Sequence, residues 1–198
     1  LLRPGMTVLE TGVSDGVSAM GLMAAAGGAR VLLSDRQTAF SCSSGRPRRF
    51  YDADGALLSL KLPGFYLCTG LRAEPPADAS AISLLNPALE GVPGAKLIPF
   101  DVFTGGLEEK PDVIKCANVL NAVYFGRERV RAALENLLRN LGDGGWLFVA
   151  QNHPRYRDGE AYVGLRRENG AFALRAQANG HELLAELATP LYRGLVRE

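Results

Sequence analysis

The sequence predicts an α/β fold with a mostly parallel sheet, on two observations. Short apolar runs alternate with segments of helical composition through most of the chain. Three of these runs end at or near an acid, namely Glu10, Asp35 and Asp101, and glycine-rich or polar corners follow them. Strands that alternate with helices are joined by right-handed crossovers, which lay the strands side by side and parallel.

The first part of the chain predicts a strand, a turn, a helix and a second strand. Residues 6–11 ("MTVLET") form a short apolar run, and the turn "GVSDG" follows at 12–16. Residues 17–27 are rich in Ala, Leu and Met, which favours a helix that closes at the pair of glycines after it. Residues 29–35 ("ARVLLSD") predict a second buried strand that ends in an acid.

The next segment interrupts this alternation. Residues 48–68 alternate apolar and polar side chains around "DADG", whose Asp-Gly pair is typical of a tight turn. We interpret the stretch at about 46–70 as an inserted β-hairpin. We expect this hairpin either to cover the substrate pocket or to form a dimer contact, because an isolated hairpin needs packing to be stable. Residues 78–94 predict a weak helix that contains Pro87.

The alternation of strands and helices then returns. The pattern predicts strands at 95–103 and 113–117, and residues 126–142 form the clearest helix of the chain. In that helix apolar side chains recur on one face and Arg and Glu on the other. A fifth strand is expected at 146–151, and residues 160–180 predict a C-terminal antiparallel hairpin that turns at an Asn-Gly pair.

The composition favours one domain over 1–198 that carries the hairpin as an insertion. Apolar residues make up 47% of the 198 residues, and the formal net charge of +1 gives no reason to expect a nucleic-acid partner. Three cysteines and two histidines are too few and too scattered for a disulfide framework or a metal site. No apolar run approaches the ~20 residues that span a bilayer, and no signal peptide is visible. Free thiols fit a reducing compartment, so we expect a cytoplasmic protein.

The predicted site lies beyond the carboxyl ends of the parallel strands, where open α/β sheets bind their ligands. Glycines in the 12–16 turn let the backbone approach a ligand, and the helix after Gly16 points free N–H groups at it. Asp35, at the end of the second strand, stands where a ribose diol would be held and would repel a 2′-phosphate. The glycine turn, the start of the helix and Asp35 follow one another in this order. Together they favour a site for a nucleoside-like ligand over a turn with a purely structural role.

The same turn argues against two common nucleotide motifs. The spacing of Gly12 and Gly16 does not fit the G-x-G-x-x-G fingerprint of dinucleotide-binding units, and the P-loop pattern is absent from the sequence. Glu10 precedes Gly12 by two residues, and a carboxylate there is unfavourable beside a pyrophosphate. It is favourable beside the cationic group of an amino acid.

These residues together resemble the class I S-adenosylmethionine-dependent methyltransferases. "VLETGVSDG" and "VLLSD" are similar to the first two motifs of that family, and "FDVF" to the third. "DVIKCANVLNAVYF" and "LLRNLGDGGWLFVA" are similar to its fourth strand and to its following helix and fifth strand. The resemblance covers about 7–150 apart from the insertion. It departs from the family at Ser14, where many members have glycine, and at Asp143, where many have proline.

The resemblance implies a Rossmann-like fold, S-adenosylmethionine as the cofactor and S-adenosylhomocysteine as the product. Methyl transfer from a sulfonium requires mainly alignment of donor and acceptor, and no metal. The cofactor site would comprise Glu10, Gly12, Ser14, Asp15, Gly16, Asp35, Arg36, Asp101, Val102 and Asn118. Of these, Glu10 and the 12–16 turn would hold the methionine part, Asp35 the ribose, and Asp101 with Val102 the adenine.

The acceptor side is expected on the loops after the fourth and fifth strands. The candidate catalytic residues are Asn121, Tyr124 and His153, with Tyr156 on the same rim. His153 could act as a general base, although a packed or surface histidine is the alternative. For Tyr124 and Phe125 we expect core contacts rather than substrate clamps.

Three other functions stay open on the sequence alone. "CANVLNAVYF" is similar to a segment of the chemotaxis-receptor glutamate methyltransferases, which suggests a protein-glutamate O-methyltransferase-like enzyme. A nucleotide-dependent oxidoreductase and a non-catalytic S-adenosylmethionine-binding or interaction protein are the other two. We expect a small-molecule acceptor of unidentified chemistry, and leave homodimer formation open.

Overall fold

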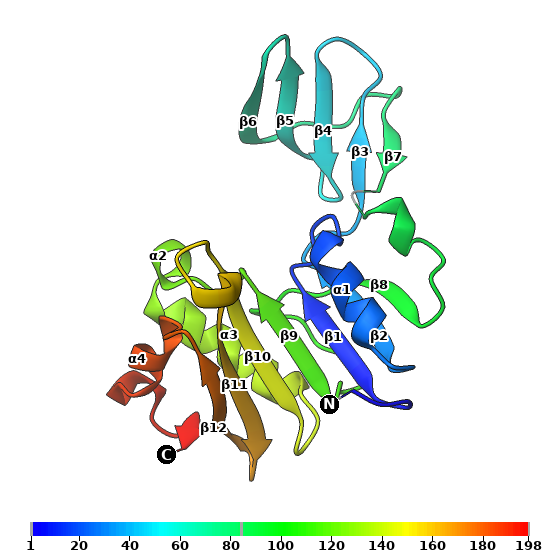
Figure 1. Cartoon of the computed structure of the whole chain (residues 1–198). Helices are drawn as coiled ribbons and strands as arrows, with labels where there is room; N and C mark the ends of the chain where they lie inside the picture. Colours follow the sequence, from blue (N-terminus) through cyan, green and yellow to red (C-terminus); the bar gives the residue numbers. More distant parts are fainter. Residues whose placement is uncertain (1, 84, 198) are drawn as a thin grey trace. The chain divides into compact units, whose positions relative to one another are not determined.

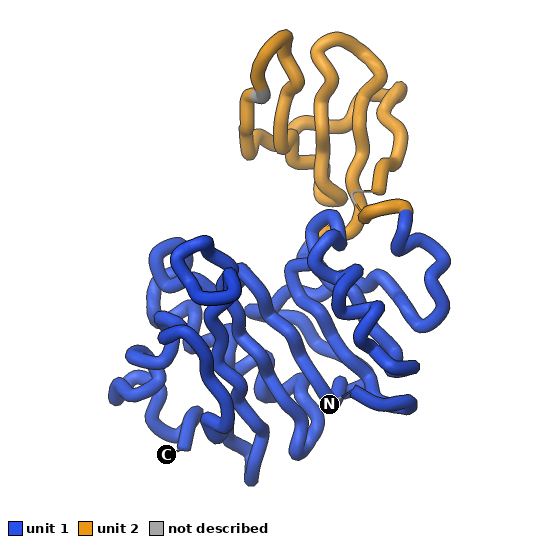
Figure 2. Tube along the Cα trace, in the orientation of Figure 1, with its two compact units in different colours: residues 1–36, 88–198 blue, residues 37–87 orange. Residues whose placement is uncertain are grey.

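The computed structural model describes residues 2–83 and 85–197, and it divides into two compact units. The first unit comprises Leu1–Arg36 with Ala88–Glu198, and the second comprises Gln37–Pro87 (Figure 2). The second unit is therefore an insertion between two strands of the first.

The first unit is built on an eight-stranded sheet with the order β13-β12-β11-β10-β9-β1-β2-β8. The run from β10 to β8 pairs in parallel throughout, while β11 is antiparallel to both β10 and β12. The mostly parallel sheet with a C-terminal antiparallel hairpin is thus confirmed. The strands of the sheet are β1 (Thr7–Thr11), β2 (Arg30–Asp35), β8 (Ala95–Pro99), β9 (Val113–Ala117), β10 (Trp146–Asn152), β11 (Glu160–Glu168), β12 (Ala171–Ala178) and β13 (Val196–Arg197).

Two helices cover opposite faces of this sheet, α1 (Val17–Ala25) and α3 (Arg127–Asn140) (Figure 1). The apolar face of α3 contributes Leu134 and Leu137 to a core that also contains Leu9 and Ile114, all of them buried. The helix predicted at 126–142 is therefore confirmed. Its apolar face packs on the sheet, as the spacing of its apolar residues predicts. The remaining helical elements of this unit are α2 (Ala122–Phe125), α4 (Leu183–Leu187) and the 3₁₀ turns at Pro87–Leu89, Arg157–Gly159 and Pro190–Tyr192.

The second unit is a five-stranded antiparallel sheet with the order β6-β5-β4-β3-β7. Its strands are β3 (Phe40–Cys42), β4 (Arg48–Asp52), β5 (Ala56–Leu62), β6 (Phe65–Arg72) and β7 (Ser80–Ile82). The hairpin predicted at about 46–70 is present as part of it, but the prediction underestimates the insertion. The "DADG" turn forms because the buried Asp52 accepts hydrogen bonds through Oδ1 from the backbone N–H groups of Asp54 and Ala56, at 3.0 and 2.7 Å.

The weak helix predicted at 78–94 is wrong. The segment instead contributes the edge strand β7, and then a 3₁₀ turn that begins at Pro87. Proline has no N–H to donate and fixes its own φ, so a helix could not continue through it. The backbone of β7 pairs with β3 instead.

His181, just before α4, is a buried histidine with an unusual environment. Its Nδ1 accepts a hydrogen bond from the backbone N–H of Leu183 at 3.1 Å, while its Nε2 is buried and has no partner among the described residues. Burial lowers the pKa of His181 below its ordinary value of 6.5, and the nearby Glu182 carboxylate opposes this shift. The folded protein therefore favours the neutral imidazole.

We expect the stability of the protein to fall as the pH drops through the ordinary histidine pKa toward the lower folded value. Over that window the unfolded chain binds the proton more readily than the folded one, so protonation draws the equilibrium toward unfolding. Urea unfolding at a series of pH values should show this slope, and His181→Asn should flatten it. His153→Asn removes an exposed histidine and should leave the slope in place. An unchanged slope in His181→Asn would contradict this assignment.

Candidate functional site

The carboxyl ends of the five parallel strands meet at one edge of the first unit, and the strand order reverses around β1. From β1 the chain continues outward through β2 and β8 on one side, and through β9 and β10 on the other. A crevice for a ligand is expected at such a reversal. This edge carries, in order across the sheet, Asp101, Asp35, the 12–16 turn, Asn118 and the corner that begins at Asn152.

The 12–16 turn has the backbone that its glycines predict. Gly12 and Gly16 have φ values of 67° and 81°, and Ser14 between them also lies in the left-handed region, at 52°. A Cβ atom on Gly12 would lie 2.3 Å from Cγ2 of Val119, which follows β9. Gly12 therefore permits a close approach between the two halves of the edge, at the point where the strand order reverses.

Asp35 is hydrogen-bonded to this turn. Its Oδ2 accepts from the backbone N–H of Ser14 at 3.0 Å, and the N–H of Val13 donates to the Ser34 carbonyl at 2.9 Å. The side chain of Ser34 in turn donates to the Glu10 carbonyl at 3.0 Å. The end of β2 thus fixes the shape of the glycine turn, which the sequence analysis did not anticipate.

Asp101 lies close to Asp35, because the backbone N–H of Phe100 donates to the Asp35 carbonyl at 2.8 Å. Asp101 accepts through Oδ1 from the N–H of Phe103 at 2.8 Å, and the Nε of Arg36 lies 3.8 Å from its Oδ2. The structure therefore brings Asp35, Arg36 and Asp101 together as the sequence predicts. Val102 differs, since its side chain is buried in the core.

Two buried asparagines on α3 hold the Asp101 loop. Asn136 Nδ2 donates to the carbonyls of Val102 and Gly105 at 3.2 and 3.0 Å. Asn140 Nδ2 donates to the Gly105 carbonyl at 2.9 Å, and its Oδ1 accepts from the N–H of Leu107 at 2.8 Å. Neither residue was predicted from the sequence, although two amides four positions apart on the apolar side of an amphipathic helix were a visible signal.

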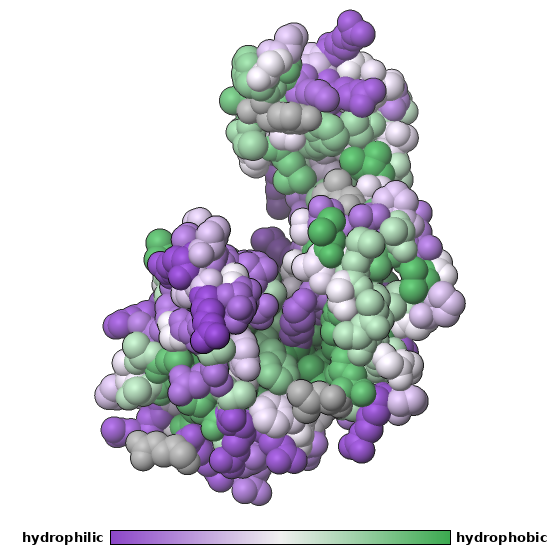
Figure 3. Space-filling view, in the orientation of Figure 1, coloured by the Kyte–Doolittle hydropathy of each residue, from purple (hydrophilic) through white to green (hydrophobic). Residues whose placement is uncertain are grey.

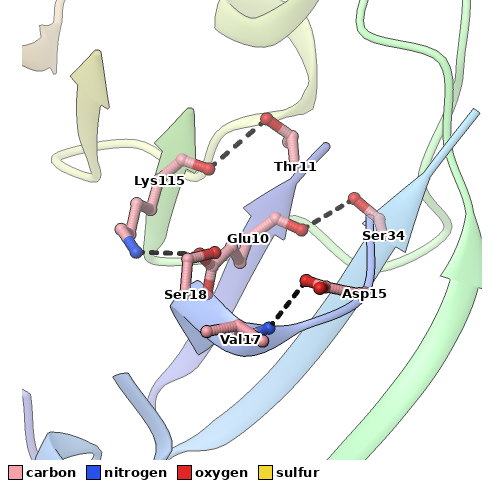
Figure 4. Close-up of polar contacts among 7 residues, drawn as sticks. All are labelled: Glu10, Thr11, Asp15, Val17, Ser18, Ser34 and Lys115. Carbon is pink, nitrogen blue, oxygen red and sulfur yellow. Dashed lines mark hydrogen bonds and ion pairs between the residues drawn. The ribbon is translucent and has the colours of Figure 1, made fainter. Parts of the chain in front are cut away.

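Glu10 is almost fully buried, with 1% of its surface exposed, and it is already paired with a cation (Figure 4). Its Oε1 accepts from Lys115 Nζ at 2.8 Å and from the Ser18 hydroxyl at 3.1 Å. Its Oε2 is buried and has no partner among the described residues. Lys115 lies directly opposite Glu10 in the parallel pairing of β1 and β9. The sequence analysis assigned Glu10 to a ligand cation and missed Lys115.

The remaining predicted cofactor residues have structural partners. Asp15 accepts through Oδ1 from the backbone N–H of Val17 at 3.1 Å, which satisfies a donor at the start of α1. Asn118 has a φ of 57°, and its Oδ1 accepts from the N–H of Asn152 at 2.8 Å. Asn118 therefore ties the corners after β9 and β10 to each other.

The candidate catalytic residues lie on the rim after β9 and β10, as predicted. Asn121 caps α2, because its Oδ1 accepts from the N–H of Val123 at 2.8 Å. Tyr124 is 83% exposed, so the alternative that it is a core contact is wrong. His153 is also exposed, and its Nδ1 accepts from the N–H of Arg155 at 3.1 Å. The His153 ring packs edge-on to Tyr156, with centroids 6.1 Å apart.

Cys116, next to Lys115 on β9, is not suited to nucleophilic chemistry. Its side chain is fully buried, and burial raises the pKa of its thiol to about 11. A thiol in that state carries almost no thiolate at neutral pH, so Cys116 is a core residue.

A cavity of about 680 Å³ lies on the sheet face that carries α1, since Leu22 of that helix is among its lining residues. Figure 3 shows apolar side chains gathered in a hollow on this face. The Trp146 and Phe148 rings stack there, with centroids 5.6 Å apart. The lining includes Lys115, Trp146, Phe148, Ala150, Tyr162 and Arg166. This cavity could not be predicted from the sequence, because it forms from side chains of four strands and of α1 that meet only in the folded unit.

Within 2–83 and 85–197, two further classes of site find no support. No group of three or more His, Cys, Asp or Glu side chains comes together there as a metal site would require. None of the helices in these ranges has the length and apolar character needed to cross a bilayer.

No protein-family model and no curated protein matches this chain. Among solved structures, N-methyltransferase NodS from Bradyrhizobium japonicum in complex with S-adenosyl-L-homocysteine is 14% identical, with a TM-score of 0.39 over 73% of this chain and 52% of NodS. The S-adenosylmethionine-dependent methyltransferase SibL is 19% identical, with a TM-score of 0.43 over 73% of this chain and 30% of SibL. CalS10 from Micromonospora echinaspora, an amino pentose methyltransferase with bound S-adenosylmethionine, is 17% identical, with a TM-score of 0.40 over 81% of this chain and 55% of CalS10. The chain thus spans about half of NodS and CalS10 and less than a third of SibL, and we base its function on its own residues.

Proposed function

We propose that the first unit binds S-adenosylmethionine at the carboxyl edge of its sheet and transfers the methyl group to a small-molecule acceptor. The observation that carries this proposal is the ordered set of Glu10, the 12–16 turn, Asp35 and Asp101 around the reversal of strand order. Hydrogen bonds link Asp35 to the turn and to the strand end that precedes Asp101. The motif order that resembles the methyltransferase family supports the same reading.

The residues at this edge fit the cofactor chemically. Asp35 uses Oδ2 to hold the turn, and a carboxylate has further lone pairs to accept from a ribose diol. Asp101 would lie beside the base, and Arg36 next to it balances the charge of two neighbouring acids. The buried Oε2 of Glu10 has no partner in the part of the chain that the structure describes, so it can accept from a cationic donor at the methionine end. The bound cofactor supplies an activated methyl group on its sulfonium.

The chain's own contribution to the reaction is alignment of the methyl donor and the acceptor. The 12–16 turn and the amide groups at the start of α1 would fix the methionine end, and the Asn118 corner would border the acceptor. His153 would donate a hydrogen bond to the acceptor from Nε2, because its Nδ1 accepts from the Arg155 N–H and the neutral ring then carries its proton on Nε2. Free thiols at Cys42, Cys68 and Cys116 suit a reducing compartment, so we propose that the protein works in the cytoplasm.

A turnover screen tests this function. The protein is incubated with methyl-labelled S-adenosylmethionine and panels of phenols, amines and carboxylic acids, and S-adenosylhomocysteine is measured together with labelled product. Formation of both, above the rate without acceptor, supports the proposal. A folded protein that binds S-adenosylmethionine but forms no S-adenosylhomocysteine with any panel would instead be a non-catalytic binding protein.

A further inference from the structure

The ion pair between Glu10 and Lys115 is a feature of the candidate site that the proposed chemistry does not explain. Both groups lie on the face of the sheet that carries α1, since Ser18 of that helix also donates to Glu10 (Figure 4). The Glu10 side chain is 2% exposed and that of Lys115 is 27% exposed. A carboxylate this deeply buried requires a counter-charge, and Lys115 supplies it in the ligand-free chain.

The ammonium of Lys115 and the α-ammonium of an amino-acid ligand are chemically alike. Each is a compact cation with three N–H donors, and each would seek the Glu10 carboxylate. We propose that Lys115 is an internal, displaceable counter-ion that occupies at Glu10 the place of the cofactor's α-ammonium group. This inference rests on the proposed function, because it names how the methionine end of that same site is controlled.

The structure offers both a vacant acceptor and a place for Lys115 to go. Oε2 of Glu10 is buried and has no partner among the described residues, so the carboxylate can accept from one more donor than it has. Lys115 also lines the 680 Å³ cavity on the same face. Its side chain therefore has open space into which the ammonium can turn when it leaves Glu10.

The consequence is a selective penalty on ligands that carry an α-ammonium. Oε2 can accept a hydrogen bond from such a ligand, but the ligand must compete with Lys115 for the one negative charge of Glu10. A nucleoside without the amino-acid part does not. Lys115 therefore acts as a positioning residue that sets the affinity for the cofactor through Glu10, without contributing to the binding of the adenosine part.

Calorimetric titration of Lys115→Gln with two probes tests this. S-adenosylhomocysteine carries the amino-acid part, and 5′-methylthioadenosine has the same nucleoside without it. We expect Lys115→Gln to bind S-adenosylhomocysteine about tenfold more tightly than the unaltered protein, the scale of one charge-assisted hydrogen bond, and 5′-methylthioadenosine within about twofold. Lys96→Gln, the same change at an exposed lysine on β8, should alter neither affinity.

A second variant keeps the test decisive if Lys115→Gln folds poorly. Glu10→Gln combined with Lys115→Met makes the pair neutral, and it should bind the two probes with nearly equal affinity. If the unaltered protein binds both probes and neither variant changes their affinity ratio, the counter-ion role is overturned while the proposed function stands. If the unaltered, folded protein binds neither probe, the proposed function itself fails, and this role with it.

Discussion

Replacing Lys115 with Met is expected to lower the free energy of unfolding by about 3–5 kcal/mol, the usual effect of breaking a buried ion pair on one side. Lys115 Nζ lies 2.8 Å from Glu10 Oε1, and the carboxylate has almost no exposure to water. The methionine side chain has a similar reach but offers no charge and no donor. Glu10 would then stay buried with the Ser18 hydroxyl as its remaining donor. Urea unfolding at neutral pH measures the loss.

The matched control is the double variant Glu10→Gln with Lys115→Met. It removes both charges, so no buried carboxylate is left without a counter-ion, and replacement of a whole buried pair is often neutral or stabilising. We expect its stability to return close to that of the unaltered protein. If the single and double variants lose the same free energy, the pair is not coupled and the account of Glu10 is wrong.

Gly105→Ala is expected to cost roughly 2–3 kcal/mol of stability, as overpacking of a closed site does. A Cβ atom there would lie 2.7 Å from the Asp101 carbonyl oxygen and 2.9 Å from the Asp101 N. These are backbone atoms, so the loop itself must shift. The loop cannot shift freely, because Asn136 and Asn140 both donate to the Gly105 carbonyl. Thermal unfolding and urea titration measure the effect.

Gly106→Ala is the control for this prediction, because a Cβ atom on the next residue meets nothing within 4 Å. It should change the stability by a few tenths of a kcal/mol at most. We also expect Gly105→Ala, and not Gly106→Ala, to weaken binding of an adenine nucleoside, since the distorted loop carries Asp101. Equal effects of the two substitutions would show that Asn136 and Asn140 do not fix this loop.

Seven of the eight strands of the first unit could be predicted because each is a local pattern, whereas the two-residue β13 shows none. Four of the five residues at 113–117 are apolar, the exception being Lys115, and β9 has those bounds. The inserted sheet could not be predicted in full. Its strands β3 and β7 have three residues each, too short to show alternation, and they pair with each other across a long stretch of chain. Only the local β4–β5 turn left a signal in the sequence.

The candidate site likewise has features that could be predicted from the sequence and features that could not. The acids at the strand ends and the glycine turn are sequential features, so their meeting at one edge follows from a parallel sheet. The pairing of Glu10 with Lys115 depends on the register between β1 and β9, which no local pattern specifies. The clamp formed by Asn136 and Asn140 likewise depends on how α3 packs against the loop after β8.

The most direct test of the central claim is calorimetric titration of the unaltered protein and of Asp35→Asn with S-adenosylmethionine. Asn keeps an acceptor for the Ser14 N–H but loses the carboxylate that would hold the ribose diol. We expect micromolar binding by the unaltered protein, weakened about tenfold or more in Asp35→Asn and unchanged in Asp54→Ala, an exposed acid of the inserted sheet. Absence of binding by a demonstrably folded protein, or equal affinity in Asp35→Asn, would contradict a nucleoside site at this edge.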